Sequence, residues 1–453
     1  MRQELVPTND AVFGWISEIV AQGIRRPAYP ADRWTEEYCL QRFRDLGMEN
    51  TRLEPFEVNL WEPRRWSLAA WNEDAGASSA IILPCFPVPY TVPVDGLTAR
   101  LVGFDGDSAA KGDALFLRRE LPRLPYDGFL TAATACYDPK HTFEGYEQVL
   151  PFSVGRAEDI DQVIASGASA FIASVAGYPG DCCEQYAPYR GLILPTPGVW
   201  TSGESGARLG AMLARGAVSI RLSVEADIHV AESNNVLGEL PGADEELVVV
   251  GSHHDGPWTS AVEDASGVAL VLAQAEYWSR VPRGERPHRM LFLLQGGHMA
   301  GGAGHKEFAA RHGDDMDRIV LSAHLEHAAA ECVKSDGALL TTGRPEPRWW
   351  FTSCIPQLEK TVLGALESER LVRSVVLRPD VFGFNLPTDA SGFNEAGVPL
   401  VSFLSAPFYL FDSQDTLEKV DRENLSSLTR AMIRIIESTH GQSAKSMREA
   451  RID

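Results

Sequence analysis

Histidine and acidic side chains gather in three short segments of this sequence, each placed directly after a run of apolar residues. The segments read SHHDGPWTSAVEDASG from residue 252, QGGHMAGGAGH from residue 295 and HLEH from residue 324. They hold six of the chain's 11 histidines, more than chance clustering readily produces. Imidazole and carboxylate groups together suit zinc, manganese, iron or cobalt. The three segments therefore predict a site for a divalent transition metal.

Such a metal would supply hydrolytic chemistry, because three protein ligands lower the pKa of a bound water from about 15.7 towards about 7. Each of these residues could instead have a structural role and bind no metal. A lone histidine after a strand is usually a satisfied polar group, and Asp264 could cap a helix that begins near Gly267. Convergence of three strand ends favours a site over these readings for four residues, which are His253, Asp255, Glu263 and Glu326.

The elements that must position these residues alternate as strand, loop and helix from residue 234 onward. Apolar, β-branched runs predict buried strands at 246–252, 289–296, 318–326 and 399–404, and helical spacing predicts helices at 267–281, 357–369 and 422–438. This alternation is typical of an α/β fold, a mixed sheet covered by helices on both faces. Ligands of such sheets bind at the carboxyl ends of the strands, which is where the three segments lie.

The rest of the chain divides into two parts. Residues 1–88 begin with two helices and continue into strand-rich sequence, and we expect them to belong to the catalytic domain formed with residues 229–453. Residues 89–228 consist of short β-like runs punctuated by Pro and Gly, which predicts an inserted β-rich domain.

The chain carries a formal net charge of −21, from 41 Lys plus Arg against 62 Asp plus Glu. Such a surface repels phosphate backbones and anionic membranes, so nucleic acid and membranes are not expected partners. The first residues contain no apolar signal-peptide core, and no apolar run approaches the roughly 20 residues of a membrane span. We expect a cytoplasmic protein that acts on a small-molecule substrate and that could form a homo-oligomer.

The most specific pattern is SNNVLGELPGADEELVVVGSHHDG followed by SAVEDASGVALVLAQAEYW. It resembles the zinc-aminopeptidase superfamily, which includes bacterial leucyl aminopeptidases and glutaminyl cyclases. In that family a strand ends in His-x-Asp, and a short loop leads to an Asp-x-Ala-Ser-Gly-like helix start. The resemblance covers most of the chain, since residues 89–228 resemble the protease-associated domain often inserted there. It implies the zinc-exopeptidase fold.

Carried over position by position, the resemblance implies that His253 is the first metal ligand and that Asp255 is the carboxylate that orients it. Glu263 stands where the family has an aspartate that bridges two metals. Glu326 falls on the remaining ligand of the first metal. The resemblance thus implies a site of His253, Glu263 and Glu326 for one divalent ion, which could be zinc, manganese, iron or cobalt.

Three departures from the family pattern affect the second metal. Glu263 is about 1.5 Å longer than aspartate, a large change against the roughly 3.5–4 Å between paired metals. Where the family has a Glu-Glu pair, the general base and a second-metal ligand, this chain reads Gly297-His298. The family's last histidine ligand aligns with Phe411. We therefore expect a single catalytic metal, with His298 as a fourth ligand or as the base.

A proton shuttle is still required, and imidazole titrates near neutrality. The candidates are His254, His298 and His327. Alternation along a strand would place His327 on the face opposite Glu326, so we expect the catalytic groups to be His298 and His254, with Asp255 as the orienting carboxylate.

These departures favour a metal-dependent hydrolase that releases an amine or ammonia from a small non-peptide substrate. The chain resembles 5-nitroanthranilate aminohydrolase in having one metal, no peptidase base and several aromatic residues near the last site loop. Tyr409 is one of these aromatic residues and is expected to bind substrate. Arg378, before that loop, could bind a substrate carboxylate bidentately.

Two alternatives remain. The first is a true metallo-aminopeptidase with an unusual base, which would need an acidic residue to hold the substrate α-amino group. The second is a non-catalytic binding protein that kept the fold and lost the chemistry. Against the second, Glu263 and His298 retain metal-ligating side chains, whereas drift would more often leave alanine, serine or asparagine.

Overall fold

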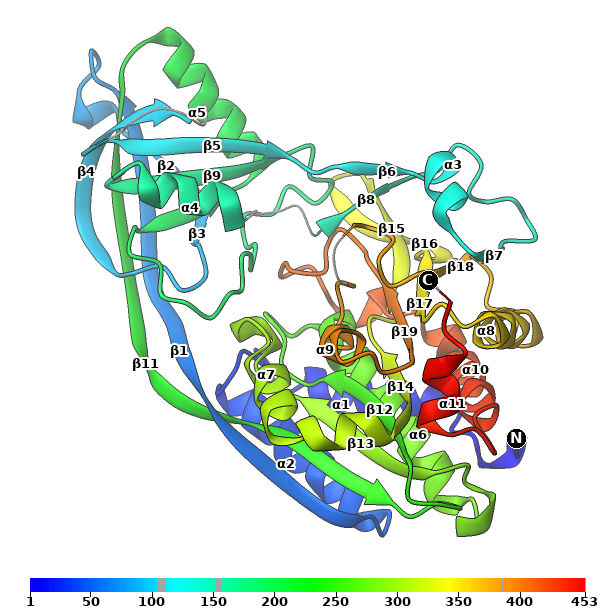
Figure 1. Ribbon diagram of the computed structural model, residues 1–453. Helices are drawn as coiled ribbons and strands as arrows, with labels where there is room; N and C mark the ends of the chain where they lie inside the picture. Colours follow the sequence, from blue (N-terminus) through cyan, green and yellow to red (C-terminus); the bar gives the residue numbers. More distant parts are fainter. Residues whose placement is uncertain (105–110, 152–156, 384–385, 453) are drawn as a thin grey trace.

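One 15-stranded mixed sheet runs through both halves of the computed structural model, which describes residues 1–104, 111–151, 157–383 and 386–452 (Figure 1). Its catalytic half contains β11 (Val218–Leu240), β12 (Leu247–His253), β13 (Arg289–Gln295), β14 (Ile319–Leu325), β17 (Arg348–Thr352), β18 (Ser374–Leu377) and β19 (Leu400–Ser405), with β7 (Ala135–Tyr137) at the edge. The order is β11-β13-β12-β14-β19-β17-β18-β7. Strands β13, β12, β14 and β19 are parallel, whereas β11 and β17 run antiparallel to their neighbours β13 and β19.

Helices cover both faces of this half, as the sequence predicts. The helices are α1 (Asn9–Val20), α2 (Pro30–Asp45), α6 (Gly267–Arg280), α7 (Ala303–Arg311), α8 (Pro356–Ser368), α9 (Ser391–Glu395), α10 (Leu425–Glu437) and α11 (Ala444–Glu449). Because side chains alternate along a strand, Val248 and Val250 of β12 share a core with α1, α6 and α10. Leu247 and Val249 share the opposite core with α7 and α9.

The inserted unit contributes the other end of the sheet. Its strands are β3 (Cys85–Pro87), β4 (Val94–Gly103), β5 (Ala114–Glu120), β9 (Ala170–Ala176) and β10 (Gly198–Thr201), and its helices are α4 (Ala157–Ala165) and α5 (Gly203–Arg215). The order β3-β10-β9-β5-β4-β11 joins them to the catalytic half. A long antiparallel ribbon of β11 with β1 (Glu49–Asn72), flanked by β2 (Ile81–Leu83), connects the two units along one side of the molecule (Figure 1). The boundary expected at residue 228 falls inside β11, so the two units share this strand.

Two small hairpin-like sheets complete the described structure. One pairs β15 (Ala330–Ser335) with β16 (Ala338–Pro345), and the other pairs β6 (Arg123–Pro125) with β8 (Glu147–Val149), next to the short helix α3 (Tyr126–Phe129). Among the described residues, every helix is too short or too polar to cross a bilayer.

Two helical glycines test how tightly the site face is packed. A Cβ on Gly304 of α7 would lie 2.3 Å from the carbonyl oxygen of Gly296, in the loop after β13, whereas a Cβ on Gly364 of α8 would meet nothing within 4 Å. We predict that Gly304→Ala destabilises the protein by about 1–3 kcal/mol through overpacking. Gly364→Ala should stabilise it by up to about 1 kcal/mol through helix propensity. Urea unfolding midpoints measure both changes, and equal midpoints for the two variants would contradict the prediction.

Candidate metal centre

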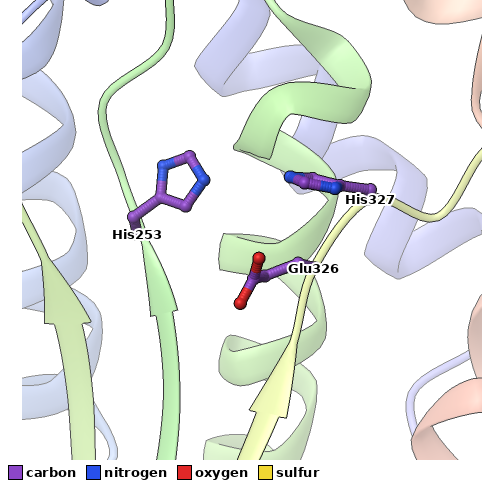
Figure 2. Close-up of side chains that lie close together, drawn as sticks. All are labelled: His253, Glu326 and His327. Atoms are coloured by element: carbon purple, nitrogen blue, oxygen red, sulfur yellow. The ribbon is translucent and has the colours of Figure 1, made fainter. Parts of the chain in front are cut away.

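The carboxyl ends of β12, β13 and β14 meet at one edge of the sheet, because the three strands are parallel and His253 pairs in register with Gln295. His253 is the last residue of β12. Figure 2 shows its imidazole facing Glu326 and His327, which lie on the turn after β14. All three side chains are buried. The structure thus brings together strand ends that the sequence places far apart.

Polar atoms of four side chains converge here, and none of them has a hydrogen-bond partner among the described residues. They are Nε2 of His253, both carboxylate oxygens of Glu263, Oε2 of Glu326 and Nε2 of His327. His327 Nε2 lies 2.6 Å from one Glu263 carboxylate oxygen and His253 Nε2 lies 3.4 Å from the other, in contacts that lack hydrogen-bond geometry. The ligand atoms of His253, Glu326 and His327 lie within 4.8 Å of one another. Each buried group left unsatisfied costs about 1–3 kcal/mol, and more if charged.

The ionisable side chains of this cluster also have pKa values shifted from their ordinary ranges. Burial raises the pKa of Glu326 well above its ordinary value. Burial lowers the pKa of His327, but the negative charge of Glu263 overcomes this and raises it to about 9. The pKa of Glu263 is lowered. Burial alone would raise it, but the charges of His327 and His253 bring it well below its usual range. Two imidazoles and two carboxylates are a donor set for zinc and similar ions, so the residues present fit a divalent metal.

Buried carboxylates of neighbouring loops hold the ligands in place. Asp264 Oδ1 accepts hydrogen bonds from the N–H groups of Gly267 and His327, both at 3.0 Å. Asp264 therefore both caps α6 and fixes the turn that carries His327. Asp415 accepts from the N–H groups of Val262 and Glu263, with the Glu263 bond at 2.8 Å.

His327 corrects an expectation drawn from strand alternation. Strand β14 ends at Leu325, and His327 adopts a left-handed backbone conformation with φ of 52°. Period-two alternation no longer applies beyond the strand end, so His327 and Glu326 face the same cluster instead of opposite faces. The His327 Nδ1 contacts the Ser405 carbonyl oxygen at 3.1 Å, which leaves Nε2 towards the cluster.

Asp255 orients His253 through its backbone rather than through its carboxylate. His253 Nδ1 lies 2.9 Å from the Asp255 carbonyl oxygen and 4.0 Å from the carboxylate. The carboxylate instead accepts from the N–H groups of His298 at 3.0 Å and Met299 at 2.7 Å. The expected contact between the two side chains is therefore corrected: the Asp255 carboxylate fixes the loop after β13.

His254 points away from the cluster, which corrects its expected role as a base. Its Nδ1 lies 2.8 Å from Asp32 Oδ1, and its Nε2 lies 2.8 Å from the Asn234 carbonyl oxygen. Burial lowers the pKa of His254, but the charge of Asp32 raises it to about 9. Glu36, which could form a second metal group with these residues, already accepts from the Asn234 N–H at 2.8 Å and from its side-chain amide. This network secures α2 to the sheet.

The two residues expected to bind substrate lie elsewhere. Arg378 follows β18, which is four strands from β12 in the sheet, or roughly 19 Å at about 4.8 Å per strand. Tyr409 is fully buried, and its hydroxyl donates to the Ala330 carbonyl oxygen at 2.7 Å. Neither lines the pocket described below, so the expectation for both is corrected.

His298 does face the cluster, in a pair with an acidic residue that the sequence reading missed. Its ring stacks on His253 with centroids 4.0 Å apart. Its Nδ1 lies 2.6 Å from Asp389 Oδ1, and its Nε2 lies 3.8 Å from Glu263. Asp389 Oδ2 is buried and has no hydrogen-bond partner within the part of the chain that the structure describes. Burial raises the pKa of Asp389, but the charges of His298 and His253 hold it well below its usual range.

A pocket of about 290 Å³ opens over His298 and Asp389. One wall is Tyr189, which comes from the inserted unit and whose ring lies 5.4 Å from His298 at an angle of 28°. Phe411 packs against Tyr189 with centroids 5.0 Å apart. The sequence reading missed Asp389 and Tyr189. The strand-end rule, applied to β18, would have directed attention to the loop that carries Asp389, but no local pattern marks Tyr189.

Comparisons with known proteins bear on the family and the fold. Residues 235–436 match the model of peptidase family M28. A peptidase M28 precursor from Shewanella amazonensis is 18% identical, with a TM-score of 0.73 over 95% of this chain and 93% of that one. An aminopeptidase from Aneurinibacillus sp. is 17% identical, with a TM-score of 0.67 over 97% and 95% of the two chains.

A zinc aminopeptidase from Bacillus subtilis is also 17% identical, with a TM-score of 0.65 over 94% of this chain and 95% of that one. No curated protein matches the sequence. The predicted resemblance and the predicted fold class are confirmed: residues 235–436 match the peptidase family M28 model, and the chain has the fold of these three proteins.

The cluster predicts that His327 is required for metal binding. His327→Ala should lower the affinity for Zn²⁺ by more than the roughly 10- to 100-fold that loss of an outer-shell partner costs. His305→Ala, at the pocket wall, should leave the affinity unchanged. Competition with a chromogenic chelator measures the affinity, and elemental analysis should give one ion per wild-type chain. Unchanged binding by His327→Ala, or by Glu326→Ala, would contradict the assignment.

Proposed function

We propose that this protein is a metal-dependent aminopeptidase that works with one divalent ion. The observation that carries the proposal is the convergence of orphaned nitrogen and oxygen atoms of His253, Glu263, Glu326 and His327. The family M28 domain and the aminopeptidases of the same fold support peptide substrates. The four side chains would hold the metal, which when bound lowers the pKa of water and polarises a carbonyl group.

One ion accounts for the arrangement better than two. The described residues offer another group beside the cluster, His253 with His298 and Asp389, but it shares His253 with the first group. His253 Nδ1 is already occupied by the Asp255 carbonyl oxygen. Phe411, at the position of the family's last histidine ligand, packs its ring against Tyr189 and offers no donor.

His298 is the proton acceptor in this proposal. The Asp389 carboxylate holds Nδ1, which leaves Nε2 facing the cluster. As a water oxygen bonds to the scissile carbonyl carbon, Nε2 takes the water proton. The same atom then delivers the proton to the leaving nitrogen as the C–N bond breaks. A histidine paired with a carboxylate thus replaces the glutamate base that the family pattern has and this chain lacks.

Tyr189 is placed to assist at the carbonyl oxygen. Burial raises the pKa of Tyr189, and the negative charges of Glu263, Asp389 and Glu326 raise it further, so the phenol stays protonated. As the carbonyl electron pair moves onto oxygen, the phenol O–H can donate a hydrogen bond to the developing negative charge.

The non-peptide aminohydrolase reading receives less support than the aminopeptidase reading. Arg378, which could bind a substrate carboxylate, and Tyr409, one of the aromatic residues near the last site loop, do not line the pocket. The structures of the same fold carry aminopeptidase names. A non-catalytic binding protein would not need the His298–Asp389 pair beside the metal cluster.

The function is tested with an aminoacyl p-nitroanilide. We predict that the zinc-loaded wild-type protein releases p-nitroaniline, that a chelator abolishes the release, and that zinc restores it. His298→Gln should lower kcat by about 10²–10⁴-fold, the usual contribution of a general base, without lowering the metal content. Absence of release together with conversion of an amino-nitrobenzoate, followed by its visible absorbance, would favour the aminohydrolase reading. Absence of any bound metal would favour a binding protein.

Tyr189 and Tyr409 form a matched pair for a second prediction. Tyr189→Phe should lower kcat on the same anilide by about 10²–10³-fold, as removal of an oxyanion donor does, with little change in KM. Tyr409→Phe should leave kcat nearly unchanged, because its hydroxyl donates to the Ala330 carbonyl oxygen and Tyr409 does not line the pocket. The opposite ranking of the two variants would remove Tyr189 from the mechanism.

A further inference from the structure

The inserted unit reaches the catalytic half at both edges of its sheet. At one edge the two units share β11. At the opposite edge, residues 121–150 of the inserted unit, here called the strap, follow β5 and place β7 antiparallel to β18, with Ala135 paired to Val376 (Figure 1). The strap therefore extends from the inserted unit to the last strand of the catalytic half.

Apolar side chains of the strap pack on the loop that follows β18. Phe129 is buried in one core with side chains of β17, β18 and β19. Its ring stacks on Phe382 of that loop, with centroids 5.8 Å apart and an angle of 11° between the rings. The same core contains Leu386 and Ala390. Because these two residues lie on either side of Asp389 in the sequence, the strap packs on the segment that carries Asp389.

Hydrogen bonds fasten the strap near its other end. The Gln148 side chain is buried, and its Nε2 donates to Glu346 Oε1 at 2.8 Å and to the Ala406 carbonyl oxygen at 3.0 Å. Its Oε1 accepts from the Tyr126 hydroxyl at 2.9 Å, and that hydroxyl accepts from Trp349 Nε1 at 2.8 Å. Directional bonds as well as apolar packing thus hold the strap in one position on the catalytic half.

The loop that carries Asp389 depends on such neighbours for its position. Its described residues form no helix or strand between Leu377, where β18 ends, and Ser391, where α9 begins. Asp389 Oδ1 must nevertheless stay 2.6 Å from His298 Nδ1, and the Asp389 N–H donates to Glu326 Oε1 at 3.2 Å. Catalytic groups on loops need support from packed neighbours, because a displacement of about 1 Å can cost about 10²-fold in rate.

We propose that the strap of the inserted unit positions Asp389, and through it His298, with Phe129 and Gln148 as the positioning residues. The inference rests on the proposed function and deepens it, since it gives the inserted unit a second role besides the pocket wall formed by Tyr189. Neither Phe129 nor Gln148 lines the pocket. Both act through the loop after β18, which keeps the proton acceptor in line with the metal cluster.

Truncation of Phe129 tests the role of the strap. Phe129→Ala removes the ring that packs on the loop, and Phe129→Leu restores part of its volume. The matched control is Phe116→Ala, because Phe116 also belongs to the inserted unit and is 7% exposed against 8% for Phe129, but is buried in a different core. Hydrogen exchange of the zinc-loaded proteins measures the mobility of residues 386–397, with residues 267–280 of α6 as the internal reference.

We expect Phe129→Ala to speed exchange of residues 386–397 by about 10-fold through local opening, with exchange of α6 unchanged. It should lower kcat on leucyl p-nitroanilide by about 10²-fold, with little change in KM and with the wild-type zinc content. Phe129→Leu should recover most of both losses, and Phe116→Ala should alter neither quantity. Equal effects of Phe129→Ala and Phe116→Ala would overturn the proposal, as would faster exchange of the loop with an unchanged kcat.

A second variant covers the case in which Phe129→Ala does not fold. Gln148→Met keeps the length of the side chain and removes its amide, so it should also speed exchange of residues 386–397. The exchange measurement requires no turnover, and faster exchange in the strap variants would support the inference even if no anilide is hydrolysed. Wild-type exchange of this loop in Phe129→Leu and Gln148→Met would overturn it even if the protein proves to be an aminopeptidase.

Discussion

The buried nitrogen and oxygen atoms of His253, Glu263, Glu326 and His327 face one another where the central strands end, and the described residues give them no hydrogen-bond partner. Burial without such a partner is costly, so a bound cation would stabilise the cluster. Hydrogen bonds in the surrounding loops hold the ligand residues in position. Asp264, Asp415 and the Asp255 carboxylate all accept backbone N–H groups of the residues that carry or flank the ligands.

Buried charged side chains surround this metal cluster. Arg25 is fully buried and donates to backbone carbonyl oxygens of the loop that follows β12, among them those of His254 and Ser260. Burial lowers the pKa of Arg25, and the nearby carboxylates, Asp415 foremost, oppose this. The His254–Asp32 pair lies behind the cluster and completes the connection to α2. Arg25 thus holds the loop that follows β12 from behind the cluster.

The inserted unit belongs to the site as well as to the sheet. Its segment before β10 is fastened to the catalytic half by the Tyr186 N–H, which donates to the Phe411 carbonyl oxygen at 2.8 Å. The Asn59 side chain donates to the Gly191 carbonyl oxygen at 2.9 Å from the other side. Tyr189 lies between these two anchors and forms a pocket wall. Phe411 gives this segment an apolar surface to pack on.

Local pattern determined the sheet with helices on both faces, because apolar periodicity specifies strands and helices within short windows. The same pattern located His253, Glu263, Glu326 and His298, since the end of a strand can be read from its own residues. Long-range packing decided the rest. His327 turns inward because its backbone leaves the strand, and His254 turns away because Asp32, on a distant helix, holds it. Tyr189 reaches the pocket only through a segment anchored by contacts remote in sequence, which no local pattern encodes. Asp389 lies in the loop after β18, which the strand-end rule could have marked.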